Sequence, residues 1–190
     1  MDLWTVINAL LAMEVREIEG REAHPSAGVI DSQCVKTTES GGPRGYHARK
    51  KIKGRRPHII TDTLGLILHV IVHTADIQDR DGAPDLLKAI RYRFPWLRHV
   101  FADGGYAGAK LRGALRGQGD WTIAIIKRSD TAKGFEVLPH RWVVKRAFAW
   151  IGRCRRLAKD WEQSISSATT WAYIVNVRIL TRRLARYRWA

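Results

Sequence analysis

Two short stretches of the sequence place an aspartate where it could hold a metal ion. The apolar run 100–102 ends at Asp103, which Gly104 and Gly105 follow, and the run 28–30 ends at Asp31. An aspartate at the carboxyl end of a strand, released by a turn, points into open space. Carboxylate oxygens are hard ligands of the kind that Mg²⁺ prefers. The two strand-end aspartates therefore predict metal-assisted chemistry.

The charge balance of the chain indicates a polyanionic partner. Lys and Arg number 33 against 18 Asp and Glu, so the net charge is +15 over 190 residues. Such an excess favours nucleic acid or an anionic membrane surface, and a merely soluble basic protein is the alternative. The length fits one domain, and the hydrophobic content of 45% is enough for a packed core.

Other features of the composition exclude several classes of protein. Cys34 and Cys154 are too few for a disulfide framework and form no C-x-x-C pair, which fits a reducing, cytoplasmic location. No apolar run reaches the roughly 18 residues of a transmembrane helix. The beginning of the chain lacks the features of a secretory signal, so we expect no membrane partner.

The order of the predicted elements indicates a fold class. We expect a helical remnant and linker over 1–27 and one domain over 28–190. Strands are predicted at 28–32, 58–61, 66–73, 99–102 and 121–126, and helices at 2–22, 79–93, 107–116, 141–160 and 169–187. Three strands followed by alternating helices and strands match an α/β ribonuclease H-like fold, a mixed five-stranded sheet flanked by helices. In this plan Asp31 and Asp103 lie on neighbouring strands and share one metal.

Several separated motifs then identify a family. The segment 141–160, RWVVKRAFAWIGRCRRLAKD, closely resembles the last catalytic helix of bacterial insertion-sequence DDE transposases. Four other runs look like further motifs of that family in the same order: 30–33, 37–46, 61–65 and 76–83. The resemblance extends from about residue 20 to the end of the chain.

The resemblance implies a function and a set of site residues. It implies a DNA transposase that cleaves DNA and transfers strands with Mg²⁺ or Mn²⁺, with Asp31 and Asp103 as the first two metal-binding acids. The family's third acid is a glutamate in a Val-Val-Glu-Arg context, and here that position is Lys145. A protonated lysine offers donors and no acceptor. We therefore expect the Lys145 ammonium to lie near one of the two aspartates, where a metal would sit, and the activity to be weak or absent.

The remaining acidic residues receive structural interpretations. Asp62 is predicted to belong to a hairpin turn, and Asp76, Asp79 and Asp81 to cap a helix or face solvent. The fifteen residues from Lys145 to Asp160 correspond to roughly 22 Å along a helix, so neither Asp160 nor Glu162 could replace the missing acid.

A set of cations is predicted to contact DNA. Its members are Arg141, Arg146, Arg153, Arg155, Arg156 and Lys159. Contacts of this kind hold phosphates without reading sequence, and the alternative is a charged face in water. The resemblance implies element ends and target DNA as partners, with a homodimer possible.

The departures from the family pattern leave two further hypotheses open. Related transposases carry a longer helical region before the first aspartate, so this sequence is interpreted as a truncated copy. A non-catalytic DNA-binding remnant is the alternative function, and a ribonuclease H-like nuclease outside transposition is a third.

Overall fold

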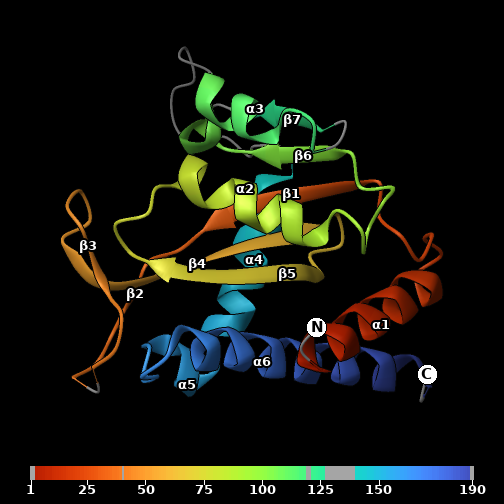
Figure 1. The fold of residues 1–190 in the computed structure, drawn as a ribbon. Coiled ribbons are helices and arrows are strands. Elements are labelled where there is room, and N and C mark those ends of the chain that lie inside the picture. Colours follow the sequence, from red (N-terminus) through yellow and green to blue (C-terminus); the bar gives the residue numbers. More distant parts are fainter. Residues whose placement is uncertain (1–2, 40, 119–120, 127–139, 189–190) are drawn as a thin grey trace, which may run out of the picture.

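A computed structural model describes residues 3–39, 41–118, 121–126 and 140–188 (Figure 1). Within these residues seven strands form one sheet. The strands are β1 (Ala27–Ser32), β2 (Val35–Lys36), β3 (Gly45–His47), β4 (Ile52–Asp62), β5 (Ile67–Thr74), β6 (His99–Ala102) and β7 (Thr122–Ile125). The helices are α1 (Leu3–Ile18), α2 (Asp79–Ile90), the 3₁₀ turn η1 (Gly104–Tyr106), α3 (Ala109–Leu115), α4 (Arg141–Gly152), α5 (Arg155–Ala158) and α6 (Ile165–Arg188).

The strand order is that of the ribonuclease H-like fold. β4 lies antiparallel between β1 and β5, while β6 runs parallel to β1 and β7 parallel to β6. These five strands are the predicted ones in the predicted order. The two short strands β2 and β3 were not predicted, because 36–57 reads as a polar, basic loop; they pair with the first half of β4, which begins at Ile52 rather than at 58.

Helices cover both faces of the sheet (Figure 1). Alternate residues of a strand point to opposite faces, and accordingly Ile30 packs with α2 and α3 whereas Val29 packs with α4 and α6. The first core also includes Leu86 and Leu111, and the second includes Val144. The carboxyl ends of β1 and β6 therefore emerge between two helical layers.

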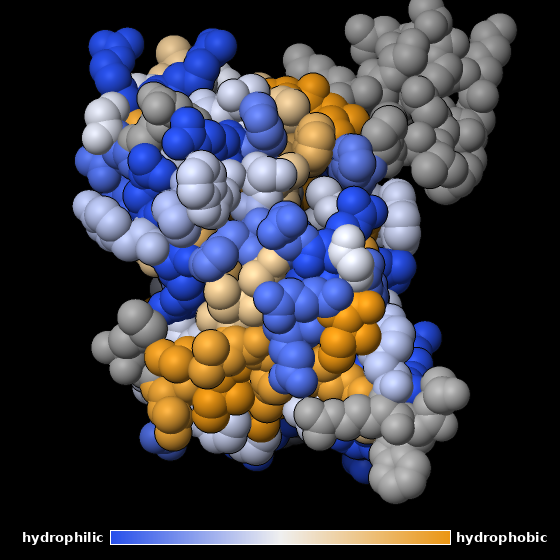
Figure 2. Space-filling view, turned by 90° about the vertical axis from the view of Figure 1, so that its right-hand side faces the viewer, coloured by the Kyte–Doolittle hydropathy of each residue, from blue (hydrophilic) through white to orange (hydrophobic). Residues whose placement is uncertain are grey.

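The first helix belongs to the same folded body. α1 packs beside α6, and its Ala12 and Val15 share a buried cluster with Leu66. The buried Arg16 guanidinium forms an ion pair with Asp62. Apolar side chains gather over the lower part of one face of the molecule (Figure 2). On α1, the apolar Leu3 is 67% exposed.

The long helix predicted over 141–160 is interrupted. α4 ends at Gly152, and the short α5 follows. The chain is then extended at Asp160, whose backbone N–H donates to the carbonyl of Lys36 at 3.0 Å. The Asp160 carboxylate accepts two hydrogen bonds from Arg55 Nη1, at 3.0 and 3.2 Å. These contacts with the sheet replace the last turns of the predicted helix.

The length and composition of the helices bear on membrane insertion. Among the residues described, no helix combines the length and apolar character needed to cross a membrane.

Candidate active site

The parallel pairing of β1 and β6 brings the two predicted aspartates together. Val29 pairs with Phe101, so Asp31 and Asp103 each follow two residues later on neighbouring strands. The two aspartates are 72 positions apart in sequence, and the segment between them contains β2 to β5 and α2. The predicted adjacency of these two strands is confirmed.

Asp103 is held by a backbone amide and an arginine. Its Oδ1 accepts the Gly105 N–H at 2.7 Å, which caps η1, and its Oδ2 lies 3.2 Å from Arg141 Nη2 at the start of α4. A Cβ added at position 105 would lie 2.8 Å from Asp79 Oδ2 and 3.0 Å from Asp103 Oδ1, so the Asp79 carboxylate would have to shift. This crowding also shows that Asp79 lies beside Asp103.

Asp79 is a member of the site that the sequence interpretation assigned to a helix cap or to solvent. It is the first residue of α2. Its Oδ1 accepts a hydrogen bond from the Ser32 hydroxyl and lies 3.4 Å from Arg56 Nη2. The side chain is 22% exposed, so it faces the site more than solvent. No local pattern signals this position, because it depends on where α2 begins relative to β1.

The environment of Asp31 disfavours its charged form. Burial raises its pKa from the usual value of 3.8 to about 6, and the nearby carboxylates of Asp103 and Asp79 contribute to the rise. The Ser32 N–H, which donates to Asp31 Oδ1 at 2.8 Å, and the Arg141 guanidinium oppose it. Three carboxylates thus share one region with an incomplete set of counter-charges.

Comparison with known proteins supports the interpretation of this geometry. The family model described as "Transposase DDE domain" matches residues 22–180. The chain belongs to the transposase DDE domain family. The "Putative transposase for insertion sequence element IS402" of Burkholderia cepacia is 32% identical over 142 residues, which cover 71% of this chain and 65% of that protein.

Solved transposases were also found by structural similarity. The catalytic domain of Mos1 mariner transposase aligns over 96% of this chain and 91% of its own, with a TM-score of 0.46 and 12% identity. The Mos1 paired-end complex with left transposon end aligns over 96% of this chain and 61% of its own, with a TM-score of 0.44 and 13% identity.

Lys145, the residue predicted to replace an acidic ligand, forms no ion pair with either aspartate in the part of the chain that the structure describes. It lies exposed on α4. Arg141 pairs with Asp103 instead. Arg141 lies at the first position of α4, one turn before Lys145, where it reaches the end of β6.

The six predicted DNA-binding cations of this transposase-family chain fall into two groups. Three have protein partners: Arg141 pairs with Asp103, Arg156 with Glu162 at 2.6 Å, and Arg146 donates to the Leu64 carbonyl at 2.9 Å. Arg146 also lies over the rings of two tryptophans, Trp142 and Trp150. The other three are exposed, and the described structure gives them no ion pair: Arg153, Arg155 and Lys159.

The side chains at the site offer a divalent cation a suitable but incomplete donor set. Asp31 and Asp103 supply carboxylate oxygens, and burial, with the nearby carboxylates of Asp103 and Asp79, raises the pKa of Asp31. Within the described ranges, however, no three His, Cys, Asp or Glu side chains are arranged to hold a metal ion. The described residues therefore offer a cation two carboxylates on neighbouring strands, without a third acidic side chain arranged to bind the same ion.

Proposed function

We propose that this chain is the catalytic part of an insertion-sequence DNA transposase, impaired in metal-dependent cleavage and strand transfer because Lys145 replaces the third acidic ligand. One observation carries the proposal: Asp31 and Asp103 end neighbouring parallel strands in a chain of the transposase DDE domain family. The net charge of +15 supports DNA as the substrate.

The chemistry assigned to the site is phosphoryl transfer at element ends and target DNA. Bound Mg²⁺ or Mn²⁺ supplies activation of the attacking oxygen and stabilisation of the leaving one. Asp31 and Asp103 hold the cation through their carboxylate oxygens. Arg141 orients Asp103 through its 3.2 Å contact and adds positive charge where a phosphate would approach.

The proposed impairment follows from the ligand count. Two carboxylates offset less of the charge of a divalent cation than three, and the cation of Lys145 on the next turn of α4 adds repulsion. Restoring the acid with Lys145→Glu should therefore raise Mg²⁺ or Mn²⁺ affinity and metal-dependent nicking of DNA.

The test compares four proteins: the wild type, Lys145→Glu, Lys145→Gln and Lys145→Glu/Asp103→Ala. Mn²⁺ affinity is measured by titration calorimetry and cleavage by nicking of a supercoiled plasmid carrying the element ends. We expect tighter Mn²⁺ binding and new nicking only in Lys145→Glu, and loss of both when Asp103→Ala is added. Unchanged Mn²⁺ affinity in Lys145→Glu would contradict the assigned ligand position.

A non-catalytic DNA-binding remnant is the second candidate function. The ion pair between Arg141 and Asp103 favours it, because a carboxylate paired with an arginine needs no metal for stability. Salt-dependent DNA binding without nicking, in the wild type and in Lys145→Glu alike, would select this function. Cleavage of RNA–DNA hybrids in preference to DNA would point instead to a nuclease outside transposition.

A further inference from the structure

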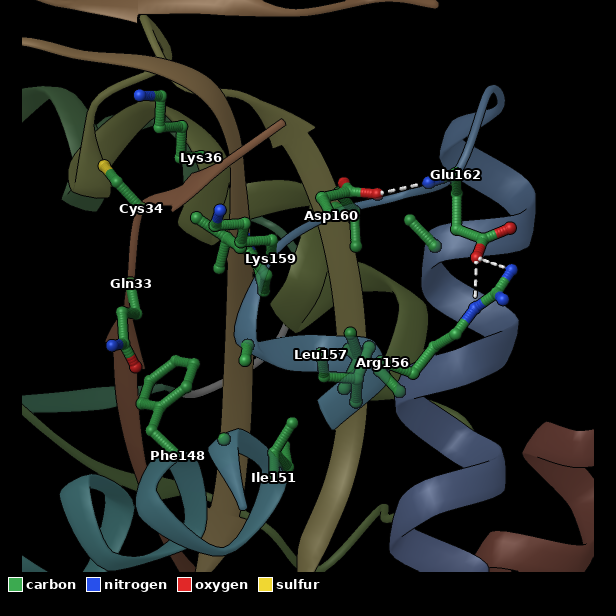
Figure 3. A pocket seen from close by; sticks show the side chains of 18 of the residues that line it. Gln33, Cys34, Lys36, Phe148, Ile151, Arg156, Leu157, Lys159, Asp160 and Glu162 are labelled. Carbon is green, nitrogen blue, oxygen red and sulfur yellow. Dashed lines mark hydrogen bonds and ion pairs between the residues drawn. The ribbon is translucent and has the colours of Figure 1, made fainter. Parts of the chain in front are cut away.

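An apolar cavity of about 340 Å³ opens between the sheet and helices α4, α5 and α6 (Figure 3). Its volume lies within the roughly 300–1,000 Å³ that small-ligand sites occupy. β4 and β5 form its floor, and α4, α5 and α6 form its walls. The apolar lining consists of Val35, Pro57, Ile59, Val70, Val72, Phe148, Ile151, Leu157, Ala158, Ala168 and Ala172.

One edge of the cavity carries a side-chain amide and an aromatic ring. Gln33, at its edge, follows Asp31 by two residues and lies beside the Phe148 ring (Figure 3). The Gln33 backbone N–H donates to the Pro57 carbonyl at 3.1 Å, which fixes this short segment against β4. A group bound in the cavity would therefore meet an aromatic ring and a side-chain amide.

The mouth of the cavity is positively charged. Lys36 and Lys159 are exposed at its rim, and no ion pair in the described structure involves either. The two acids at the rim are already neutralised: Asp160 by Arg55 at 3.0 Å, and Glu162 by Arg156 at 2.6 Å. The free charge at the entrance is thus cationic.

A second, polar hollow adjoins the first. It has a volume of about 450 Å³ and shares Lys36 and Lys159 with the cavity. Arg44 and Lys53 add two further cations, and the half-exposed indole of Trp161 forms part of its wall. With four cations against one acid, Glu39, the lining of the hollow is net basic, and the hollow meets the apolar cavity at Lys36 and Lys159.

We propose that the cavity takes one unpaired base of a DNA strand and that the adjoining basic hollow holds the phosphates beside it. Bases stack on aromatic rings in apolar pockets, and hydrogen bonds to their edges recognise them. Phe148 provides a ring for stacking, and the Gln33 amide provides hydrogen-bonding groups. Phosphates require cations, which Lys36, Lys159 and Lys53 provide. This assignment rests on the proposed action on DNA. It extends that proposal to unpaired bases, because a base that is paired inside a duplex cannot enter the cavity.

The test measures binding of the full chain to three DNA probes of equal length by fluorescence anisotropy. One probe is a fully paired duplex, one carries a single bulged 2-aminopurine, and one carries a bulged abasic site. We expect about tenfold tighter binding of the bulged base than of the paired or abasic probe, a typical contribution of one stacked base. The 2-aminopurine emission should also change on binding.

Two variants assign the effect to the cavity. Gly152→Leu enlarges one side chain of the lining and is expected to narrow the cavity: Gly152 is exposed and an added Cβ there meets nothing within 4 Å, so the fold should be kept. It should abolish the preference for the bulged base and leave paired-duplex affinity unchanged. Lys36→Gln/Lys159→Gln should weaken binding of all three probes more than its charge-matched control on the opposite face of the sheet, Lys88→Gln/Arg112→Gln.

The outcomes separate this proposal from the one on which it rests. Equal binding of all three probes by the wild type, or a full preference retained by Gly152→Leu, overturns the base-binding cavity while leaving action on DNA intact. Absence of salt-dependent binding to any probe overturns the proposed function itself. Tighter binding of the bulged-base probe supports the cavity if it is lost in Gly152→Leu together with the change in 2-aminopurine emission.

Discussion

Two clusters of arginine and aspartate side chains lie near the opposite ends of α4 and differ in their balance of charge. Beyond its C-terminus, the buried Arg55 donates to the Asp160 carboxylate and to the carbonyls of Pro43, Gln163 and Ser164. Near its N-terminus, three carboxylates share two arginines, the buried Arg56 and the partly exposed Arg141. We call the first cluster balanced, because its charges are paired within the fold. We call the second unbalanced, because its carboxylates outnumber its arginines and leave negative charge that a bound cation would offset.

The largest expected effect tests the balanced cluster. Asp160→Ala should lower the free energy of unfolding by about 3–5 kcal/mol, because it leaves the fully buried Arg55 guanidinium without its counter-charge. Urea denaturation at pH 7 measures the change. Glu162→Gln, which breaks the pair with the half-exposed Arg156, serves as the control and should cost no more than about 1 kcal/mol. Equal losses in the two variants would contradict the distinction.

Lowering the pH tests whether the buried His58 of β4 can be protonated in the folded protein. Burial, with His73 and Arg56 nearby, lowers the pKa of His58 from 6.5 to about 3. The unfolded chain therefore binds a proton that the folded chain rejects, and stability falls as the pH drops below 6.5. His58→Leu should lose about 2–3 kcal/mol less stability than the wild type between pH 7.5 and 4.5.

The remaining acid sensitivity gives an internal control for that experiment. Burial also lowers the pKa of His69 to about 4, so His58→Leu should still lose part of its stability in acid. Urea midpoints at pH 7.5 provide the baseline for each protein. Parallel stability curves for the wild type and His58→Leu would show that His58 is not the buried base responsible.

Removing a charge from the unbalanced cluster is expected to raise the free energy of unfolding rather than lower it. The pKa of Asp31 is raised to about 6, so its carboxylate is destabilising at pH 7. Asp31→Asn in EDTA should therefore raise the free energy of unfolding by about 1–3 kcal/mol. The same variant should lose the stabilisation that Mn²⁺ gives the wild type. A loss of stability comparable to that of Asp160→Ala would show that Asp31 is structural.

The sequence predicted the half of this contrast that depends on local pattern. An apolar run ending in Asp and Gly-Gly identifies the end of β6, and the strand order then places Asp31 beside Asp103. Asp79 was missed because its contact with Ser32 joins residues 47 positions apart. The interruption after Gly152 was missed for a similar reason: the basic run that follows is compatible with helix, and pairing of Asp160 with Lys36 decides otherwise.

The smallest effects compare two cations on α4 and its C-terminal end. Arg153 is exposed, whereas Arg146 packs over Trp142 and donates to the Leu64 carbonyl. If Arg153 contacts a phosphate, Arg153→Gln should reduce the slope of log affinity against log salt by about 0.9 and change stability by less than about 0.5 kcal/mol.

Arg146→Gln should show the reverse pattern, because its guanidinium is engaged within the protein. We expect about 1 kcal/mol lower stability from the lost hydrogen bond and ring contacts, with the salt slope for duplex DNA unchanged. Both variants remove one charge, so a general effect of net charge would alter their DNA binding equally. Identical salt slopes for Arg146→Gln and Arg153→Gln would therefore mean that partner contacts do not decide which cations of this helix reach DNA.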